Sequence, residues 1–136
     1  MPIKASISGP LVLLDTSGAV VEDELDVLFD AFQKASEAGP FVVLTDTSQM
    51  KSVPRSVLVA FSDRLKRMPT VRKLWLGDAV VVTSTAVRFI VSTLMIMAPL
   101  PTEMKLFAGR AQARHWCAML LRRHGLAVPP ELTTSA

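Results

Sequence analysis

Short apolar runs separated by polar residues predict the strands of a sheet. The runs at 11–14 and 41–44 are continuously apolar, as is typical of strands that are buried on both faces. We expect polar turns to end these two strands, over residues 15–18 and 45–52. A third run, 79–83, is dominated by β-branched residues, which favour extended structure. Two weaker runs complete the predicted strands, at residues 3–8 and 104–107.

Apolar residues at intervals of three and four predict a helix after every strand except the first. The clearest helix spans residues 21–38, where acidic residues in the first turn match the positive end of the helix dipole. The other helices are predicted over residues 53–67, 86–97 and 110–124. Pro54 suits a first helical turn because its missing N–H would have no partner there. We expect Ser84 and Thr85 to cap the third helix and Gly125 to end the fourth.

The order of these elements, ββαβαβαβα, predicts a single-domain α/β fold over residues 1–124. After the opening hairpin, strands and helices alternate, which favours right-handed crossovers between parallel strands. We therefore expect a mostly parallel sheet of about five strands with four helices packed on it. The remaining residues, 125–136, are predicted to form a flexible tail.

The predicted helix at 86–97 differs from the others because it is apolar nearly all round. Its polar residues are Arg88, Ser92 and Thr93. A helix of this kind is either buried within its own domain or covered by a partner, and the sequence leaves both alternatives open. The candidate contact residues for a second subunit or another protein are Phe89, Leu94, Met95 and Met97.

The composition favours a compact intracellular domain. With 136 residues, half of them hydrophobic, the chain can bury a substantial core. Its single cysteine, Cys117, cannot form an internal disulfide, which favours a reducing cytoplasm. The first residues lack the apolar core of a secretory signal, and no apolar run is long enough for a membrane span.

Charge is distributed unevenly along the chain. Residues 1–50 carry eight acids and two bases, whereas residues 51–136 carry four acids and thirteen bases. These numbers predict a molecule with oppositely charged poles, which would orient partners. The bases Arg64, Lys66 and Arg67, with two more at 72 and 73, form either a solvated surface or a docking patch for an acidic partner. Nucleic acid is not expected, because the cluster lacks a binding motif and has one aromatic neighbour.

The sequence offers no recognisable catalytic constellation. His115 and His124 lack the companions that a metal site requires, and no glycine-rich phosphate loop or nucleophile elbow is present. His115 and Cys117 suggest a nucleophile pair, but neighbouring positions of this helix point in different directions, and a core cysteine is the preferred interpretation. We therefore predict no enzyme activity and no cofactor.

The chain resembles the STAS fold, named for sulfate transporters and anti-sigma-factor antagonists, and more closely its SpoIIAA-like, or STAS/SEC14, branch. The resemblance extends over about residues 3–124. The segments that carry it are 11–18, 21–25, 40–46, 105–107 and 113–116.

This resemblance implies a small non-enzymatic module of bacterial regulatory type that acts by protein–protein contact. In anti-sigma-factor antagonists, the loop after the third strand carries a phosphorylatable serine in an Asp-Ser-Ser-Gly-like motif, where a kinase docks. In this chain residues 53–56 occupy the corresponding position, and they lack both the acidic residue that begins the motif and its glycine. Ser52 and Ser56 remain candidate phosphoacceptors, although Ser52 also suits helix capping.

The sequence therefore predicts a cytoplasmic signalling or scaffolding module, without catalysis. We expect it to bind a protein partner, or a second copy of itself, through the helix at 86–97 and the loop at 45–55. The SEC14 side of the resemblance gives an alternative, a carrier of an apolar small-molecule or lipid ligand. The excess of apolar residues over 89–97 is compatible with that alternative too.

Overall fold

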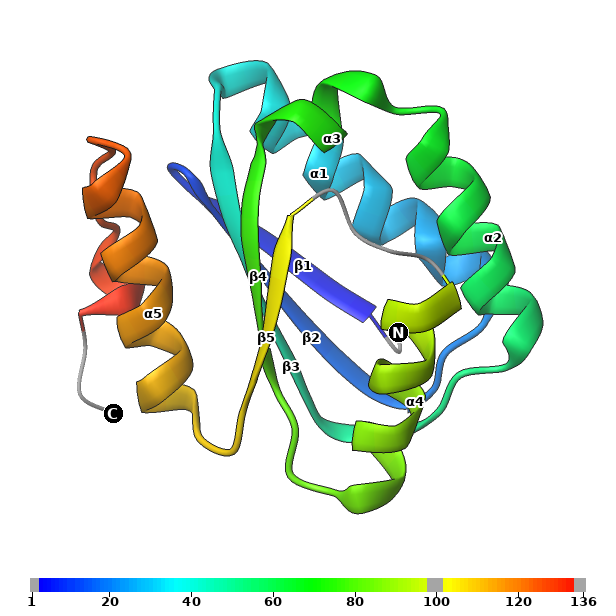
Figure 1. Cartoon of the computed structure of the whole chain (residues 1–136). Helices are drawn as coiled ribbons and strands as arrows, with labels where there is room; N and C mark the ends of the chain where they lie inside the picture. Colours follow the sequence, from blue (N-terminus) through cyan, green and yellow to red (C-terminus); the bar gives the residue numbers. More distant parts are fainter. Residues whose placement is uncertain (1–2, 98–101, 134–136) are drawn as a thin grey trace.

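The computed structural model describes residues 3–97 and 102–133, except for the side chain of Met97. Its five strands form one sheet in chain order (Figure 1). The strands are β1 (Ile3–Ser8), β2 (Leu11–Ala19), β3 (Phe41–Ser52), β4 (Trp75–Val81) and β5 (Glu103–Phe107). β1 pairs antiparallel with β2, and all later pairings are parallel. The predicted α/β class, with its opening hairpin and mostly parallel five-stranded sheet, is confirmed.

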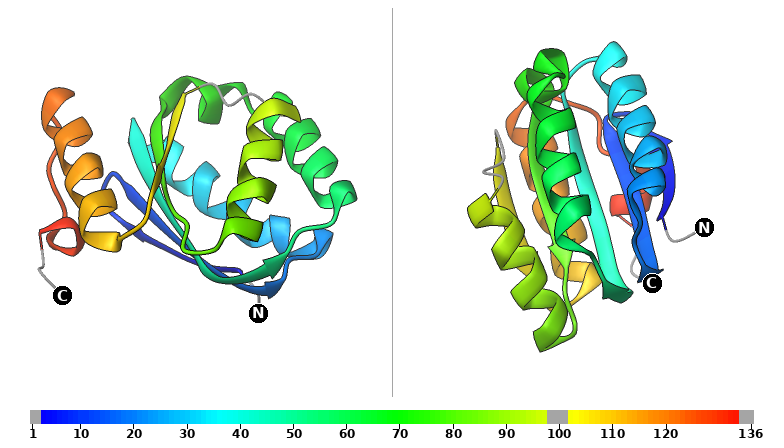
Figure 2. Two further views of the ribbon diagram at one scale, coloured as in Figure 1. Left: turned by 60° about the horizontal axis from the view of Figure 1, so that its bottom comes forward. Right: turned by 90° about the vertical axis from the view of Figure 1, so that its right-hand side faces the viewer.

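The helices lie on both faces of the sheet, in unequal numbers. Each crossover from β2 to β5 advances one strand in the same direction, so crossovers of one hand place their helices on one face. Helices α1 to α4 lie on this face and α5 lies on the other (Figure 1). The four are α1 (Leu25–Ala38), α2 (Arg55–Lys66), α3 (Pro69–Leu74) and α4 (Thr85–Met97), and α5 spans Arg110–Arg123. Figure 2 shows α2 and α4 side by side, in agreement with their contacts.

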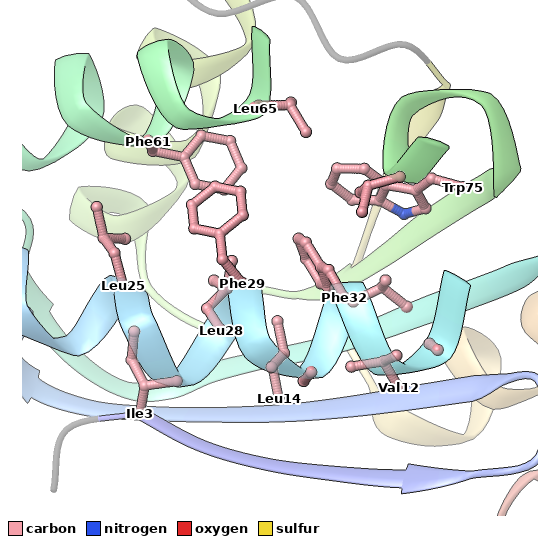
Figure 3. Packing of buried hydrophobic residues seen from close by; sticks show 14 of the residues in the cluster. Ile3, Val12, Leu14, Leu25, Leu28, Phe29, Phe32, Phe61, Leu65 and Trp75 are labelled. Carbon is pink, nitrogen blue, oxygen red and sulfur yellow. The ribbon is translucent and has the colours of Figure 1, made fainter. Parts of the chain in front are cut away.

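An aromatic cluster fills much of the layer between the sheet and α1 to α3. Phe29 and Phe32 of α1 meet edge to face, with ring centroids 5.8 Å apart. Phe61 of α2 lies 5.3 Å from the Phe29 ring, and Trp75 lies 4.9 Å from the Phe32 ring. Figure 3 shows these side chains directed toward one another above the aliphatic residues of β1 and β2. The cluster therefore joins the helices to the start of β4.

The second core lies under α5. Trp116, Cys117 and Leu121 of this helix pack on the apolar side chains of β2, β3 and β4 that face it. Gly77 allows this approach: a Cβ atom there would lie 2.6 Å from Leu120 Cδ1 and 2.9 Å from Trp116 Cη2. The absence of a side chain on β4 at this point therefore lets α5 approach the sheet closely.

The structure differs from the sequence-based expectation at the polar ends of two strands. β2 continues through residues 15–18 and β3 continues through 45–52, where polar turns were predicted. The two extensions pair with each other, from Asp15 and Asp46 to Ala19 and Ser52. Thr16 of this region donates a hydrogen bond to the backbone oxygen of Asp46, so polar side chains here have internal partners. The prediction of turns was wrong because polar side chains here find hydrogen-bond partners on adjacent strands, so the chain stays extended.

Helix boundaries also differ in places. A short 3-10 turn, Glu22–Glu24, precedes α1, and α3 is an additional helix between α2 and β4. The predicted start of the second helix at residue 53 is replaced by an N-cap at Pro54. The predicted C-terminal tail includes a 3-10 turn at Pro130–Leu132, and Leu132 is buried beside α5. Ser8 Oγ donates a hydrogen bond of 2.9 Å to Glu131, which joins this segment to the β1 end.

Candidate functional site

An apolar cavity of about 120 Å³ lies between the sheet and α1, α2 and α4. The helices contribute aliphatic and aromatic side chains to its wall, including Leu28, Phe61 and Leu94. The sheet contributes residues from all five strands, among them Ile3, Leu14 and Trp75, which Figure 3 labels. An apolar cavity of about this size can hold a molecule as small as benzene.

Four polar side chains interrupt the apolar wall of the cavity, and all come from the sheet. They are Thr16, Thr45, Thr47 and Asp78. The hydroxyl groups of Thr16 and Thr47 donate hydrogen bonds to the backbone oxygens of Asp46 and Val81, at 3.0 and 2.6 Å. The Thr45 hydroxyl donates to Asp78 Oδ1 at 3.0 Å. Each threonine therefore directs its hydroxyl proton to an acceptor of the protein.

Asp78 is the one carboxyl group on the described wall of the cavity, and it is 5% exposed. Burial raises the pKa of its carboxyl from 3.8 to about 7, and the hydrogen bond from Thr45 opposes that rise. The described residues that line the cavity include no lysine, arginine or histidine. Asp78 is thus a buried acid without a cationic partner, an arrangement that is uncommon and often functional.

A second buried carboxyl, on the opposite face of the sheet, shows what a paired acid looks like in this fold. Asp46 Oδ1 accepts a hydrogen bond from the backbone N–H of Ser48 at 2.9 Å, and Arg110 Nε lies 3.3 Å from Oδ2. Asp15 lies 3.8 Å from the same arginine. This cluster links α5 to the middle of β2 and β3, and Arg110 gives Asp46 a cationic neighbour that Asp78 lacks among the described residues of the cavity.

α4 has an inner and an outer face that are both apolar. Ile90, Val91 and Leu94 line the cavity. On the other side, Phe89 is 74% exposed and Ile96 is 81% exposed, and their spacing of seven places them on one side of the helix. The predicted contact residues thus divide: Phe89 lies outside, Leu94 faces the cavity, and Met95 is 37% exposed. The side chain of Met97 lies outside the described part of the structure.

The predicted basic patch on α2 is divided in a similar way. Arg64 Nη1 lies 2.6 Å from Asp26 Oδ1, and its guanidinium carbon lies 4.7 Å from the centre of the Phe29 ring. These contacts tie α2 to α1, so Arg64 has an internal role. Lys66 and Arg67 are exposed.

The two candidate phosphoacceptors are both exposed, at different kinds of position. Ser52 is the last residue of β3, and its backbone oxygen accepts a hydrogen bond from Val20 N–H at 2.9 Å. Ser56 lies in the first turn of α2. Because Pro54 is the N-cap, the capping role suggested for Ser52 is wrong.

The histidine and cysteine suggested as a nucleophile pair are separated. Cys117 is fully buried, and burial raises the pKa of its thiol to about 12, with the nearby negative charge of Asp78 contributing. His115 is exposed on the same helix. The predicted core role of Cys117 is confirmed. Among the described residues, no three His, Cys, Asp or Glu side chains gather as metal ligands, and no helix has the length and apolarity to cross a membrane.

Sequence reasoning missed the cavity and its polar wall. One signal was available: Asp78 interrupts the apolar run that becomes β4, and a charge within a buried strand requires an explanation. The cavity itself was not predictable by periodicity, because its wall combines side chains from eight elements.

Comparison of the structure with solved structures identifies the fold. It is similar to a protein from the DUF3478 family with a SpoIIAA-like fold from Shewanella loihica PV-4, at 18% identity and a TM-score of 0.58. That match covers 85% of this chain and 91% of the other. It is also similar to an anti-sigma factor antagonist from Mycobacterium paratuberculosis, at 12% identity and a TM-score of 0.50, over 85% and 92% of the two chains.

These likenesses show that the chain has a SpoIIAA-like fold, the fold of STAS domains, as the resemblance in the sequence implied. No protein-family model and no curated protein matches the sequence.

Proposed function

We propose that this chain is a non-enzymatic regulatory or scaffolding module that binds a protein partner through the outer face of α4. The observation that carries the proposal is the exposure of Phe89 and Ile96 on one side of that helix. The anti-sigma factor antagonist with the same fold supports the regulatory class. Exposed Lys66 and Arg67, at the C-terminal end of the neighbouring α2, favour a partner whose contact surface combines apolar and acidic residues.

Binding at this surface is favourable because it removes the apolar area of Phe89 and Ile96 from water. Full burial of a phenylalanine or isoleucine side chain stabilises a complex by about 1.5–3 kcal/mol. Two such residues, about two helical turns apart, can act as central anchors of an interface. In protein interfaces a few residues carry most of the binding energy. The proposal does not require the cavity, because Phe89 and Ile96 are directed away from it.

The test uses Phe89→Asp and Ile96→Asp, with Met119→Asp as the matched control. Met119 is an exposed apolar residue of α5, on the other side of the sheet. Tagged protein is purified from its native cells, and co-purifying proteins are quantified by mass spectrometry. We expect a stoichiometric partner that both α4 variants lose by about tenfold or more and the control retains.

One result would contradict this placement, and another would change the identity of the partner. Equal retention of the partner by all three variants would exclude the α4 face. A wild-type mass of two chains by light scattering, reduced to one by the α4 changes, would replace the foreign partner with a second copy. Intact mass of the same preparations also reports on Ser52 and Ser56: an added phosphate would support regulation there, and unmodified protein in every growth condition would contradict it.

A second candidate function, a carrier of a compact apolar ligand, is favoured by the cavity. Its volume of about 120 Å³ is comparable with that of an engineered apolar cavity of about 150 Å³ that binds benzene. Native mass spectrometry of protein from its own cells should show a bound small molecule. If repeated spectra, recorded under conditions that keep the chain folded, show only the mass of the free chain, this candidate is contradicted.

A further inference from the structure

We infer that the cavity binds a compact apolar molecule whose single polar group donates a hydrogen bond to the carboxyl group of Asp78. This inference rests on the carrier candidate and specifies the chemistry of its ligand: a small alcohol, phenol or amine with a hydrocarbon body. It is independent of the proposed contact surface on the outer face of α4.

The first argument is the state of the Asp78 carboxyl group. It belongs to the wall of the cavity and is 5% exposed. From the described residues it receives one side-chain hydrogen bond, from Thr45 to Oδ1, and none to Oδ2. A carboxylate oxygen in apolar surroundings is stabilised by a hydrogen-bond donor, and a ligand in the cavity would supply one to Oδ2.

The second argument is the direction of the remaining hydrogen bonds. Thr16, Thr45 and Thr47 each donate their hydroxyl proton to an oxygen of the protein, so their oxygens offer the cavity acceptor capacity. When Asp78 is ionised, the polar part of the described wall therefore consists of acceptors. The complementary ligand group is a hydrogen-bond donor, and the apolar residues around it require the rest of the ligand to be hydrocarbon.

The third argument is that no other titratable group lines the cavity among the residues that the structure describes. The described lining residues from α1, α2, α4 and from β1, β2, β3 and β5 are apolar residues and threonines. Across the sheet, Cys117 of α5 is the titratable neighbour that responds to Asp78, and its thiol pKa of about 12 keeps it neutral. The protonation of Asp78 alone therefore decides whether the wall accepts or donates.

The experiment compares phenol with toluene, which differ by a hydroxyl in place of a methyl group. Dissociation constants for both are measured by calorimetry with the full chain as wild type, Asp78→Leu and Asp78→Asn, with the exposed Asp63→Asn as control. A hydrogen bond to a charged group contributes enough to shift binding by about tenfold. We expect Asp78→Leu to move the preference from phenol toward toluene by about that factor, and the control to leave it unchanged.

The pH dependence gives a second readout. Since the carboxyl of Asp78 has a pKa of about 7, it changes from acid to carboxylate between pH 5.5 and 8.5, where phenol remains neutral. Phenol should bind more tightly to the wild type at pH 8.5 than at 5.5, and toluene should not. Asp78→Asn keeps the shape of the side chain, so it should bind phenol with an affinity that does not change over this range.

The outcomes separate the inference from the function on which it rests. Binding of toluene and phenol with the same preference in the wild type and Asp78→Leu would overturn the role of Asp78 and leave the carrier intact. Binding of neither compound would overturn both. A phenol preference that depends on Asp78 and increases with pH would support the inference.

Discussion

Asp78 places a carboxyl group between the sheet and the helices α1 to α4. Asp46, on the other face, has Arg110 at 3.3 Å, whereas Asp78 has no cation among the described cavity residues. A buried carboxylate without compensation is costly, and the group responds by retaining its proton to a higher pH. Such a residue weakens the fold at neutral pH, which is typical of positions that serve a function.

The cost of Asp78 can be measured as a pH-dependent difference in stability. In the unfolded chain its pKa is near 3.8, and in the native state it is about 7. Between these values the native state holds a proton that the unfolded chain has lost. The contribution of Asp78 to stability is therefore fully present below pH 3.8 and falls as pH rises to about 7. Asp78→Asn does not titrate, so it should gain stability relative to the wild type over this range.

The gain of Asp78→Asn between pH 4 and 8 should be positive and at most about 4 kcal/mol. Urea unfolding at pH 4, 6 and 8 measures it, and Asp63→Asn controls for removal of an exposed charge on α2. If the difference between the free energies of unfolding of the wild type and Asp78→Asn does not change with pH, the pKa of Asp78 is not raised in the native state.

At the scale of the single residue, residue types next to a helix end predicted the roles of Ser84 and Gly125 correctly, which the apolar periodicity alone does not do. Ser84 was expected to cap a helix, and its Oγ accepts a hydrogen bond from Val87 N–H at 3.0 Å. Gly125 was expected to end α5, and its positive φ of 70° explains why glycine serves there. These predictions depend on neighbouring residues alone. The partner of Asp78 is Thr45, 33 positions earlier, and only the fold brings the two together.

At the scale of the element, prediction succeeded where the apolar pattern was strong and failed where polar residues continue a strand. The apolar halves of β2 and β3 were identified, but their polar continuations were taken for turns. Thr16 and Thr47 lie in these continuations, are buried, and donate hydrogen bonds to Asp46 and to Val81 of β4. Because the polar groups are satisfied by adjacent strands, the extended conformation costs little there.

α4 shows the same limit in a helix. Its sequence indicated that more of its surface was apolar than a helix on a sheet needs, and two explanations were left open, burial or contact with a partner. In the structure, Val87 and Val91 are buried, Leu94 lines the cavity and Phe89 is exposed. Burial therefore explains one side of the helix, and contact with a partner is our proposal for the other side. A pattern read along the chain could not assign the sides.

At the scale of the whole molecule, the two faces of the sheet differ in what their helices do. α5, with Trp116 and Cys117, seals one face of the sheet, and Leu132 of the C-terminal segment adds to that core. On the other face, α4 stands at the edge of the helical layer, beside α2 and above β4 and β5 (Figure 2). α4 therefore carries both residues that line the cavity and the exposed apolar residues of the proposed partner surface.

This position of α4 predicts that a cavity ligand will act on that helix in particular. A ligand that contacts Ile90, Val91 and Leu94 stabilises the closed arrangement of α4 against the sheet, because binding favours the state that binds. With toluene at saturating concentration, hydrogen exchange of the α4 amides that open locally should become several-fold slower. Locally opening amides of α5, across the sheet from the cavity, provide the internal control and should exchange at unchanged rates.

The same measurement with Leu94→Asp tests whether the effect passes through the cavity wall. A carboxylate at this half-buried position should weaken toluene binding, so the added protection of α4 should be lost at the same toluene concentration. Ile96→Asp, on the outer side of the same helix, should keep it. Uniform slowing of exchange in α4 and α5 would instead indicate global stabilisation. Loss of protection in both variants would show that the two sides of α4 are not separate, and that a change to the partner surface also alters the cavity.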